Sequence, residues 1–482
     1  MRGSKYLLKN IGLLTISSFG TKLLSFFLVP LYTYMLSTTE YGTYDLFNTT
    51  VAVLIPLLTL NISDAVLRFP LDKHSDAKAI LTVGLKYFLI GLAPVVFVTL
   101  VNQFFTLIPV LKAYSALFVF LYAATALNGI MSSYARGIDH VFDLSVSGIV
   151  CSLTIIVLNI LLLVVVNWGI TGYFIANIAG IAIQAIYLFI STQAWKGLHL
   201  PANNSSLEHE MLVYSKPLMA NALAWWVNNF SARYVVIWLC GLAENGIFSV
   251  AYKIPSILNI FQTIFGQAWT LSATQDFDPE DRHGFFARTY GYYNFGMTVI
   301  CSLLIAGDRL MARLLYAKDF YIAWMSVPFL LISIVFGALS GYAGGVFSAV
   351  KDAKKIASST VIGAAVNIIL DFFLVFAFKS VGAAIANMVS YWLVWFIRMR
   401  QLRQFMTIRI NFARDNIAYL ILLIQSSLLL AFRQENLGLY ASETVLFLLI
   451  LALFYKEGIR LARKLIGAFT HFAPTRQKGK HQ

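Results

Sequence analysis

The sequence predicts an all-α integral membrane protein of about 14 transmembrane helices, with two pseudo-symmetric six-helix lobes around a central cavity and two extra C-terminal helices. Apolar residues make up 59% of the 482 residues and charged residues 12%, and the mean hydropathy is +0.75. A soluble chain carries about 25% charged residues. Apolar runs of membrane-spanning length recur along the chain, and a short motif occurs once in each half.

A helix needs roughly 20 apolar residues to cross the hydrocarbon core of a bilayer. By this criterion the predicted segments are 10–34, 42–65, 79–103, 111–134, 144–167, 171–195, 212–239, 246–272, 287–306, 321–346, 357–378, 382–402, 412–432 and 440–461. The first run is too long for a signal peptide and lacks a small-residue cleavage site, so we expect a retained helix. The gaps are too short for a soluble domain.

Lys and Arg residues predict the orientation of these segments. Most of the 36 fall in alternate gaps and in the tail after residue 455. Because cytoplasmic loops are enriched in Lys and Arg, both termini are expected in the cytoplasm. The gap that contains Arg309, Arg313 and Lys318 is the exception to this pattern.

An internal duplication organises the chain. The motif Glu40-Tyr41-Gly42-Thr43-Tyr44 is echoed 204 positions later by Glu244-Asn245-Gly246-Ile247-Phe248, each time between two apolar segments. Polar residues follow at matched positions, with Asp45 corresponding to Ser249 and Thr49 to Lys253. We expect Gly42 and Gly246 to permit tight turns and the two glutamates to lie at helix N-termini.

The duplication predicts the domain organisation. Residues 1–200 form an N-terminal six-helix lobe, residues 201–405 form a second six-helix lobe, and residues 406–482 add two helices and a basic cytoplasmic tail. An even number of crossings separates the copies, so the symmetry axis should run along the membrane normal with a cavity between the lobes. This arrangement favours transport by alternating access.

Charges within membrane segments are the candidate site residues, because they are costly there and usually face a protein interior or a cavity. Lys22, Arg233 and Lys253 are expected around an anionic substrate. The other predicted substrate-binding residues are Arg68, Asp45, Asn229 and Asp371. Two alternatives stay open: polar residues can join neighbouring helices, and an arginine near a helix end can extend to the interface.

Sequence motifs of catalysis are absent: the chain has no P-loop, nucleophile elbow, HExxH motif or Cys/His cluster. Cys151, Cys240 and Cys301 are far apart and are expected to be packing residues. The chain is predicted not to be an enzyme, to need no metal or cofactor, and to bind no nucleic acid. A membrane-embedded glycan polymerase or ligase is disfavoured by the lack of a long external loop.

Three stretches resemble the polysaccharide transporter family, the Wzx-type flippases of the multidrug/oligosaccharidyl-lipid/polysaccharide export superfamily. They are LLSFFLVPLYTYMLSTTEYGTYDLFNTT (23–50), DAVLRF (64–69) and residues 314–390. The resemblance covers nearly the whole chain. One departure is Asp371, where relatives often have Asn.

The resemblance implies a flippase in the bacterial inner membrane that moves undecaprenyl-diphosphate-linked oligosaccharide repeat units, such as O-antigen for lipopolysaccharide, to the outer leaflet. Polymerase and chain-length proteins of that pathway would be partners. The energy source stays open between H⁺ coupling, Na⁺ coupling and the membrane potential. The alternatives are a flippase for a peptidoglycan precursor or teichoic-type glycan, and a cation-coupled drug exporter.

Overall fold

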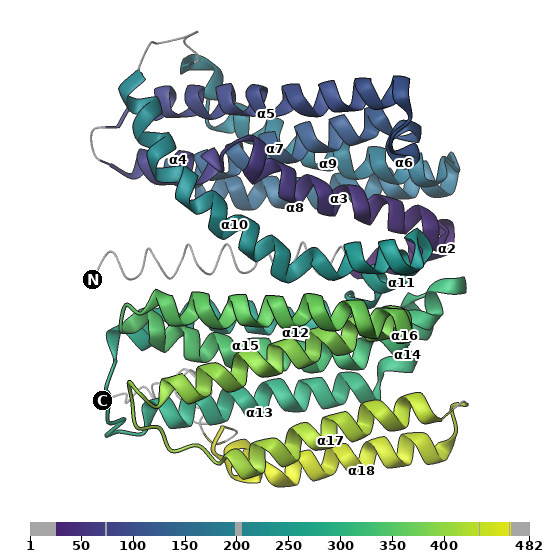
Figure 1. The fold of residues 1–482 in the computed structure, drawn as a ribbon, viewed down its shortest axis with the longest axis vertical. Helices are drawn as coiled ribbons and strands as arrows, with labels where there is room; N and C mark the ends of the chain where they lie inside the picture. The colour runs from purple at the N-terminus through teal and green to yellow at the C-terminus, as the bar shows by residue number, and fades with distance from the viewer. Residues whose placement is uncertain (1–25, 73–74, 198–204, 433, 462, 464–482) are drawn as a thin grey trace, which may run out of the picture. The chain divides into compact units, whose positions relative to one another are not determined.

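The computed structural model describes residues 26–72, 75–197, 205–432, 434–461 and 463. Within these ranges the regular structure is helical and includes no β-strand (Figure 1). The first helices are α2 (Val29–Met35), α3 (Thr38–Leu58), α4 (Ile62–Arg68), α5 (Ala77–Phe105), α6 (Pro109–Ala113), α7 (Ser115–Gly137), α8 (Val141–Asn159), α9 (Gly169–Ser191), α10 (Ser205–Cys240) and α11 (Leu242–Ala251). There follow α12 (Pro255–Gln275), α13 (Phe285–Ala306), α14 (Asp308–Leu315), α15 (Val327–Ala349), α16 (Ala353–Leu402), α17 (Phe412–Ala431) and α18 (Leu437–Leu453). Short 3₁₀ or π turns occupy Phe69–Leu71, Ile160–Val165, Ala194–Gly197 and Lys318–Met325.

The described helices confirm a multi-span membrane fold. Seven are long and apolar enough to cross a membrane, or up to 11 if each bent helix pair is one span. One of the seven, α16, is interrupted at Lys379 by a non-helical backbone (φ 54°, ψ −133°). The predicted segments 357–378 and 382–402 lie on either side of that break. The predicted first segment lies largely outside the described residues, so the count of 14 stays a prediction.

The helix that follows the first copy of the motif is broken where the sequence predicts one continuous segment. α3 and the stretch Ile62–Leu71 meet at 68°. Leu60 and Asn61 both have positive φ (52° and 54°), which an L-residue adopts at an energetic cost. The Asn61 side chain donates a hydrogen bond of 2.7 Å to Asp64 Oδ2, which supports the bend.

The equivalent segment of the second half is also broken. α11 ends at Ala251 and α12 begins at Pro255. Proline has no N–H to donate to the preceding turn and is suited to the first position of a helix. The predicted segment 246–272 is therefore two helices, with Lys253 in the turn between them.

The chain divides into two compact units, which are considered separately. Unit 1 comprises residues 1–253, 312–323 and 368–383, and unit 2 comprises 254–311, 324–367 and 384–482. α10 and α11 belong to unit 1 in this division. The lobe boundaries at residues 200 and 405 stay a prediction.

Each unit has a packed interior. In unit 1, α4, α5, α7, α9 and the start of α10 share an apolar core that includes Ile62, Val66, Leu81, Met131, Leu188 and Met211. In unit 2, α15 is buried along most of its length and packs against α12, α13 and α17. Tyr342 of α15 donates a hydrogen bond to Phe286 O (2.8 Å) and accepts one at its own carbonyl from Trp269 Nε1 (2.8 Å).

Candidate functional site

The two copies of the repeated motif contact each other within unit 1, where α3 crosses α11. A Cβ built on Gly42 would lie 1.9 Å from Leu242 O, and one built on Gly246 would lie 2.0 Å from Thr38 O. Leu242 and Thr38 are themselves separated by the repeat offset, so the two contacts are reciprocal. Repeat-equivalent atoms therefore meet across an approximate two-fold axis.

The prediction of tight turns at Gly42 and Gly246 is wrong. Both glycines lie inside helices, and neither has a positive φ. They are needed because any side chain would collide with the backbone of the opposite helix. The glutamates do lie in the first turns of α3 and α11, and Glu40 forms a capping box with Ser37, whose N–H donates to Glu40 Oε2 (2.8 Å).

Asp45 is the polar centre of the α3–α11 crossing. It lies one turn after Gly42 and is buried. Its Oδ1 accepts a hydrogen bond from Ser249 Oγ (2.6 Å), and its Oδ2 accepts one from Asn245 Nδ2 (3.2 Å). Asn245 Nδ2 also donates to Gly42 O (3.2 Å). Because buried carboxylates require such donors, these bonds fix Asp45 against the second half of the repeat.

Arg233 of α10 supplies the counter-charge for Asp45. Its Nε lies 3.1 Å from Asp45 Oδ2, and the two side chains are 13% and 10% exposed, respectively. The guanidinium also lies 4.9 Å from the centre of the Phe230 ring and 5.4 Å from that of Tyr252, distances at which a cation is attracted to an aromatic face. In this structure Arg233 is therefore engaged by a carboxylate.

Lys253 lies beside the same crossing. Its Nζ is 5.7 Å from the centre of the Tyr32 ring and 5.9 Å from that of Tyr41. These rings stack on each other with their centres 5.0 Å apart, and Tyr173 packs against both. One end of α3 thus carries a cluster of two cations and one anion: Arg233, Lys253 and Asp45.

Each of the other predicted site residues has a different setting. Lys22 is not among the described residues. Arg68 ends α4 and pairs with Asp72 at 2.8 Å on an exposed surface. Asn229 is exposed on α10, one turn before Arg233. Asp371 of α16 is fully buried, and neither carboxylate oxygen has a hydrogen-bond partner among the residues that the structure describes.

Several residues that the sequence patterns do not single out complete the cluster. Asn245 and Tyr41 stand at equivalent positions of the repeated motif; Asn245 donates to Asp45 and to Gly42 O, and the Tyr41 ring lies near Lys253. The offset alone could have indicated that both lie at the crossing. Trp226 Nε1 donates to Thr49 O (3.0 Å), and Tyr234 shares a hydrogen bond of 2.7 Å with Thr50. These bonds join α10 to α3, so Arg233 is held on a positioned helix.

Two of the three cations that contradicted the charge pattern, Arg309 and Lys318, bind backbone carbonyls. Arg309 is 4% exposed, donates to Leu429 O (2.6 Å) and to Phe432 O, and lies 4.2 Å from the centre of the Trp324 ring. It therefore satisfies carbonyls at the C-terminus of α17, where a positive charge is favourable. Lys318 donates to Tyr34 O (2.6 Å).

Lys86 also forms a specific contact. Its Nζ donates to both carboxylate oxygens of Glu208 at 2.8 Å, and Tyr87 OH donates to Glu208 Oε1 at 3.0 Å. The hydrogen bond from Lys86 lowers the pKa of Glu208. The pair joins α5 to the start of α10.

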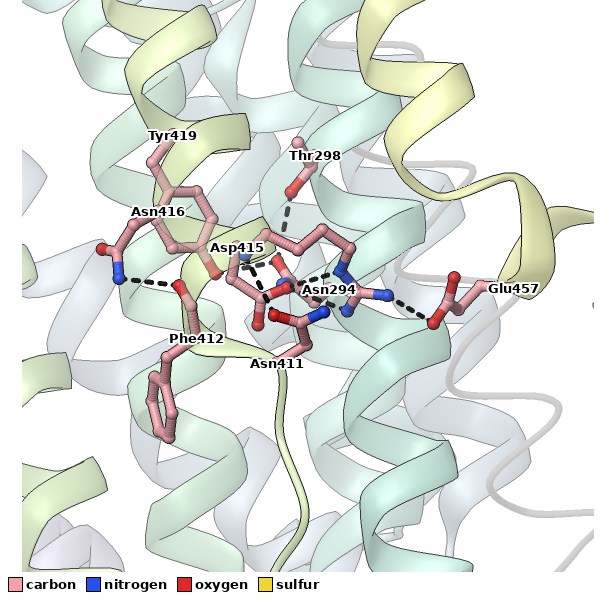
Figure 2. Close-up of polar contacts among 9 residues, drawn as sticks. Asn294, Thr298, Asn411, Phe412, Asp415, Asn416, Tyr419 and Glu457 are labelled. Atoms are coloured by element: carbon pink, nitrogen blue, oxygen red, sulfur yellow. Dashed lines mark hydrogen bonds and ion pairs between the residues drawn. The ribbon is translucent and has the colours of Figure 1, made fainter.

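Unit 2 contains a second polar network, shown in Figure 2. Arg414 donates to Asp415 Oδ1 (2.9 Å) and to Glu457, so one arginine engages both carboxylates. Beside them, Asn294 Oδ1 accepts from Tyr419 OH (3.0 Å) and Thr298 Oγ1 (3.1 Å). This network connects α17, α13 and the stretch after α18, and we assign it a structural role.

Comparisons with known proteins support the fold and the family resemblance. Residues 7–270 match the family model described as "Polysaccharide biosynthesis protein". The lipid II flippase MurJ, in an inward closed conformation, is similar at a TM-score of 0.70 and 14% identity, covering 94% of this chain and 99% of that one. No curated protein sequence matches.

Two further solved structures are similar. An inward-facing multidrug resistance MATE transporter of the MOP superfamily matches at a TM-score of 0.61 and 13% identity, over 80% of this chain and 95% of that one. A MOP superfamily transporter from Pyrococcus furiosus is described as having a binding pocket of reverse polarity. It matches at a TM-score of 0.54 and 12% identity, over 82% of this chain and 96% of that one. At these identities the likeness concerns the fold.

Proposed function

Because the chain belongs to the polysaccharide biosynthesis protein family and has the fold of MurJ and MATE transporters, we propose that it is a flippase for lipid-linked oligosaccharides. It moves undecaprenyl-diphosphate-linked repeat units, such as O-antigen units, from the cytoplasmic to the outer leaflet of the bacterial inner membrane. Both termini are cytoplasmic, transport proceeds by alternating access, and no covalent chemistry is catalysed. Polymerase and chain-length proteins of the same pathway would receive the product.

The observation that carries this proposal is the crossing of two repeat-related helices beside Arg233 and Lys253. Discontinuous helices mark the binding sites of many secondary transporters. Here the segments α3–α4 and α11–α12 are repeat-equivalent and both are broken, although the break after Leu58 lies further along its segment than the break after Ala251 does. Lys253 lies in the second break, and the cargo diphosphate would bind beside Lys253 and Arg233.

The electrostatics suit a diphosphate cargo. A lipid diphosphate carries about two negative charges, and charge-assisted hydrogen bonds from Arg or Lys offset the cost of removing it from water. Arg233 is engaged by Asp45 in this structure. The cargo diphosphate would compete with Asp45 for Arg233, so binding would weaken the α3–α11 crossing and favour the alternate state.

The membrane potential is sufficient to bias such transport. With the cytoplasm negative, each negative charge moved outward gains about 2.3 kcal/mol per 100 mV. Coupling to H⁺ or Na⁺ would add to this. We would place it at Asp371, whose buried carboxylate has no hydrogen-bond partner within the described part of the chain.

The test is export of surface glycan by a strain whose own copy of this gene is replaced with variants. Lys253→Ala and Arg233→Ala should lower export roughly tenfold or more, the effect of losing about 1.4 kcal/mol of cargo interaction. Undecaprenyl-linked repeat units should accumulate in the inner leaflet. Arg282→Ala is the control, since the Arg282 side chain pairs with Glu280 on an exposed surface.

Normal export by both variants, at normal protein levels, would contradict the cationic site. Lys22→Ala should behave as Lys253→Ala does. The fold likeness to a lipid II flippase makes a peptidoglycan precursor the second candidate cargo. In that case depletion of the protein would stop cell-wall growth and cause lysis, whereas loss of a surface-glycan flippase leaves peptidoglycan synthesis intact.

A further inference from the structure

Two adjacent hollows lie in unit 2 where α16 is followed by α17. The smaller, of about 270 Å³, is lined by residues of both helices, including Trp392, Phe396, Arg400 and Asn416. The larger, of about 670 Å³, is lined by the connecting segment between the helices, including Arg409 and Asn411. Arg403 and Phe412 line both hollows.

Arg400, Arg403 and Arg409 line these hollows, and among the described residues no ion pair involves any of them. The described residues that line the two hollows include no aspartate or glutamate. The nearby carboxylates of Asp415 and Glu457 are engaged by Arg414 instead (Figure 2).

The arginines rest on aromatic rings. The guanidinium of Arg400 lies 4.8 Å from the centre of the Phe396 ring, and that of Arg403 lies 5.1 Å from that of Phe412. This leaves their N–H groups available to an anion, and a guanidinium binds phosphate oxygens through paired hydrogen bonds. Stacking on a ring also fixes the orientation of the guanidinium before a ligand arrives.

The aromatic residues extend the hollow along α16 on the side away from the connecting segment. Trp392 is 41% exposed and Phe396 is 39% exposed, and their rings stack with centres 5.7 Å apart. Trp392 lies ten positions before the end of α16 at Leu402, so this aromatic wall lies about 15 Å deeper along the helix than its end. The site thus combines an apolar wall with a cationic end, which suits an amphiphile with an anionic headgroup.

We propose that these hollows bind a phospholipid with two phosphates, of the cardiolipin class, in the inner leaflet. One phosphate would contact Arg400 and Arg403, and the other would contact Arg403 and Arg409. The shared Arg403 and the adjacency of the hollows favour two linked phosphates over the one phosphate of phosphatidylglycerol. Basic pockets between helices on the cytoplasmic side bind such headgroups in other membrane proteins. The assignment to the inner leaflet rests on the orientation given under the proposed function.

The test uses the full-length protein, purified in detergent and stripped of lipid, with native mass spectrometry after addition of cardiolipin, phosphatidylglycerol or undecaprenyl diphosphate. The wild-type protein should retain cardiolipin in preference to phosphatidylglycerol. Arg403→Gln should weaken cardiolipin binding at least about fivefold, as expected for loss of one interfacial cation. Arg282→Gln is the charge-matched control on an exposed loop and should leave binding unchanged.

Arg400→Gln and Arg409→Gln each change one hollow, and both residues are exposed, so neither should affect folding. Each should weaken cardiolipin binding less than Arg403→Gln does. Equal binding by Arg403→Gln and Arg282→Gln would overturn the proposal. So would binding of undecaprenyl diphosphate that depends on Arg403 while cardiolipin binding does not, because the site would then belong to the cargo. Export of glycan is measured separately, so failure of the flippase proposal gives a different result.

Discussion

Asp45 and Ser249 occupy equivalent positions in the two halves of the repeat, and a hydrogen bond of 2.6 Å joins their side chains. The two copies of the repeated sequence are therefore also in contact in the folded chain. One turn earlier, Gly42 and Gly246 bring the two backbones together. These two pairs define the α3–α11 crossing on which the first two predictions depend.

Gly246→Ala should destabilise the protein by about 1–3 kcal/mol, the usual cost of overpacking. Its new Cβ would lie 2.0 Å from the carbonyl oxygen of Thr38, and a helix backbone cannot easily move away. Thermal unfolding in detergent measures the change. Gly129→Ala is the control, because beyond the backbone of its own helix no atom of a described residue lies within 4 Å of a Cβ at that position. Equal unfolding temperatures for the two variants would disprove the close approach.

Asp45→Ala should lower the free energy of unfolding by about 3–5 kcal/mol, because it leaves the largely buried Arg233 without its counter-charge. The double variant Asp45→Ala with Arg233→Met should lose less unfolding free energy than Asp45→Ala alone. A double-mutant cycle on unfolding free energies measures this coupling. Additive effects would show that the ion pair contributes nothing to the crossing.

Arg309→Ala should destabilise the protein by about 2 kcal/mol, since it leaves two carbonyls at the end of α17 without their charged donor. Cargo binding should be unaffected. Arg282→Ala, which removes an exposed arginine, should change stability by no more than about 0.5 kcal/mol. If Arg309→Ala instead abolished binding of a lipid diphosphate at unchanged stability, Arg309 would be a site residue.

The Lys86–Glu208 pair should make stability depend on pH in the acid range. Because the pKa of Glu208 is lowered from its ordinary value of 4.5, the stabilisation is complete above that value and is lost as the pH falls through the lower pKa of the folded protein. The effect is at most about 1 kcal/mol, because the pair is solvent-accessible. Unfolding of the wild type and of Lys86→Ala between pH 6 and pH 3 measures it; parallel curves would contradict the prediction.

The sequence is sufficient for features that depend on local composition and spacing. Apolar runs predict a helical membrane protein, and the offset of 204 positions pairs Asp45 with Ser249 without any knowledge of the fold. The resemblance to the polysaccharide transporter family is confirmed by the match over residues 7–270. The helical class, the repeat and the family all depend on residues that are close in sequence or separated by a constant offset.

Other features depend on partners that no local pattern indicates. The backbone contacts at Gly42 and Gly246 come from a helix about 200 positions away, so each glycine considered alone suggests a turn. Arg309 resembles a loop cation in the sequence because its carbonyl partners lie 120 and 123 positions away. The break at Asn61 is not predicted either, although Pro56 inside α3 is a local signal for a bend, because proline removes a hydrogen bond from the helix.

The contact between Asp45 and Ser249 has a consequence for how the two halves diverged. If the chain arose by fusion of two identical six-helix proteins, position 45 would first have met its own copy across the two-fold axis. Two ionised carboxylates at hydrogen-bond distance repel each other, and burial increases the free-energy cost of keeping both charged. An acidic residue could therefore be kept on only one side, with a hydroxyl donor opposite. Two glycines facing each other across the axis cause no electrostatic repulsion, and a glycine is present in both copies of the repeat.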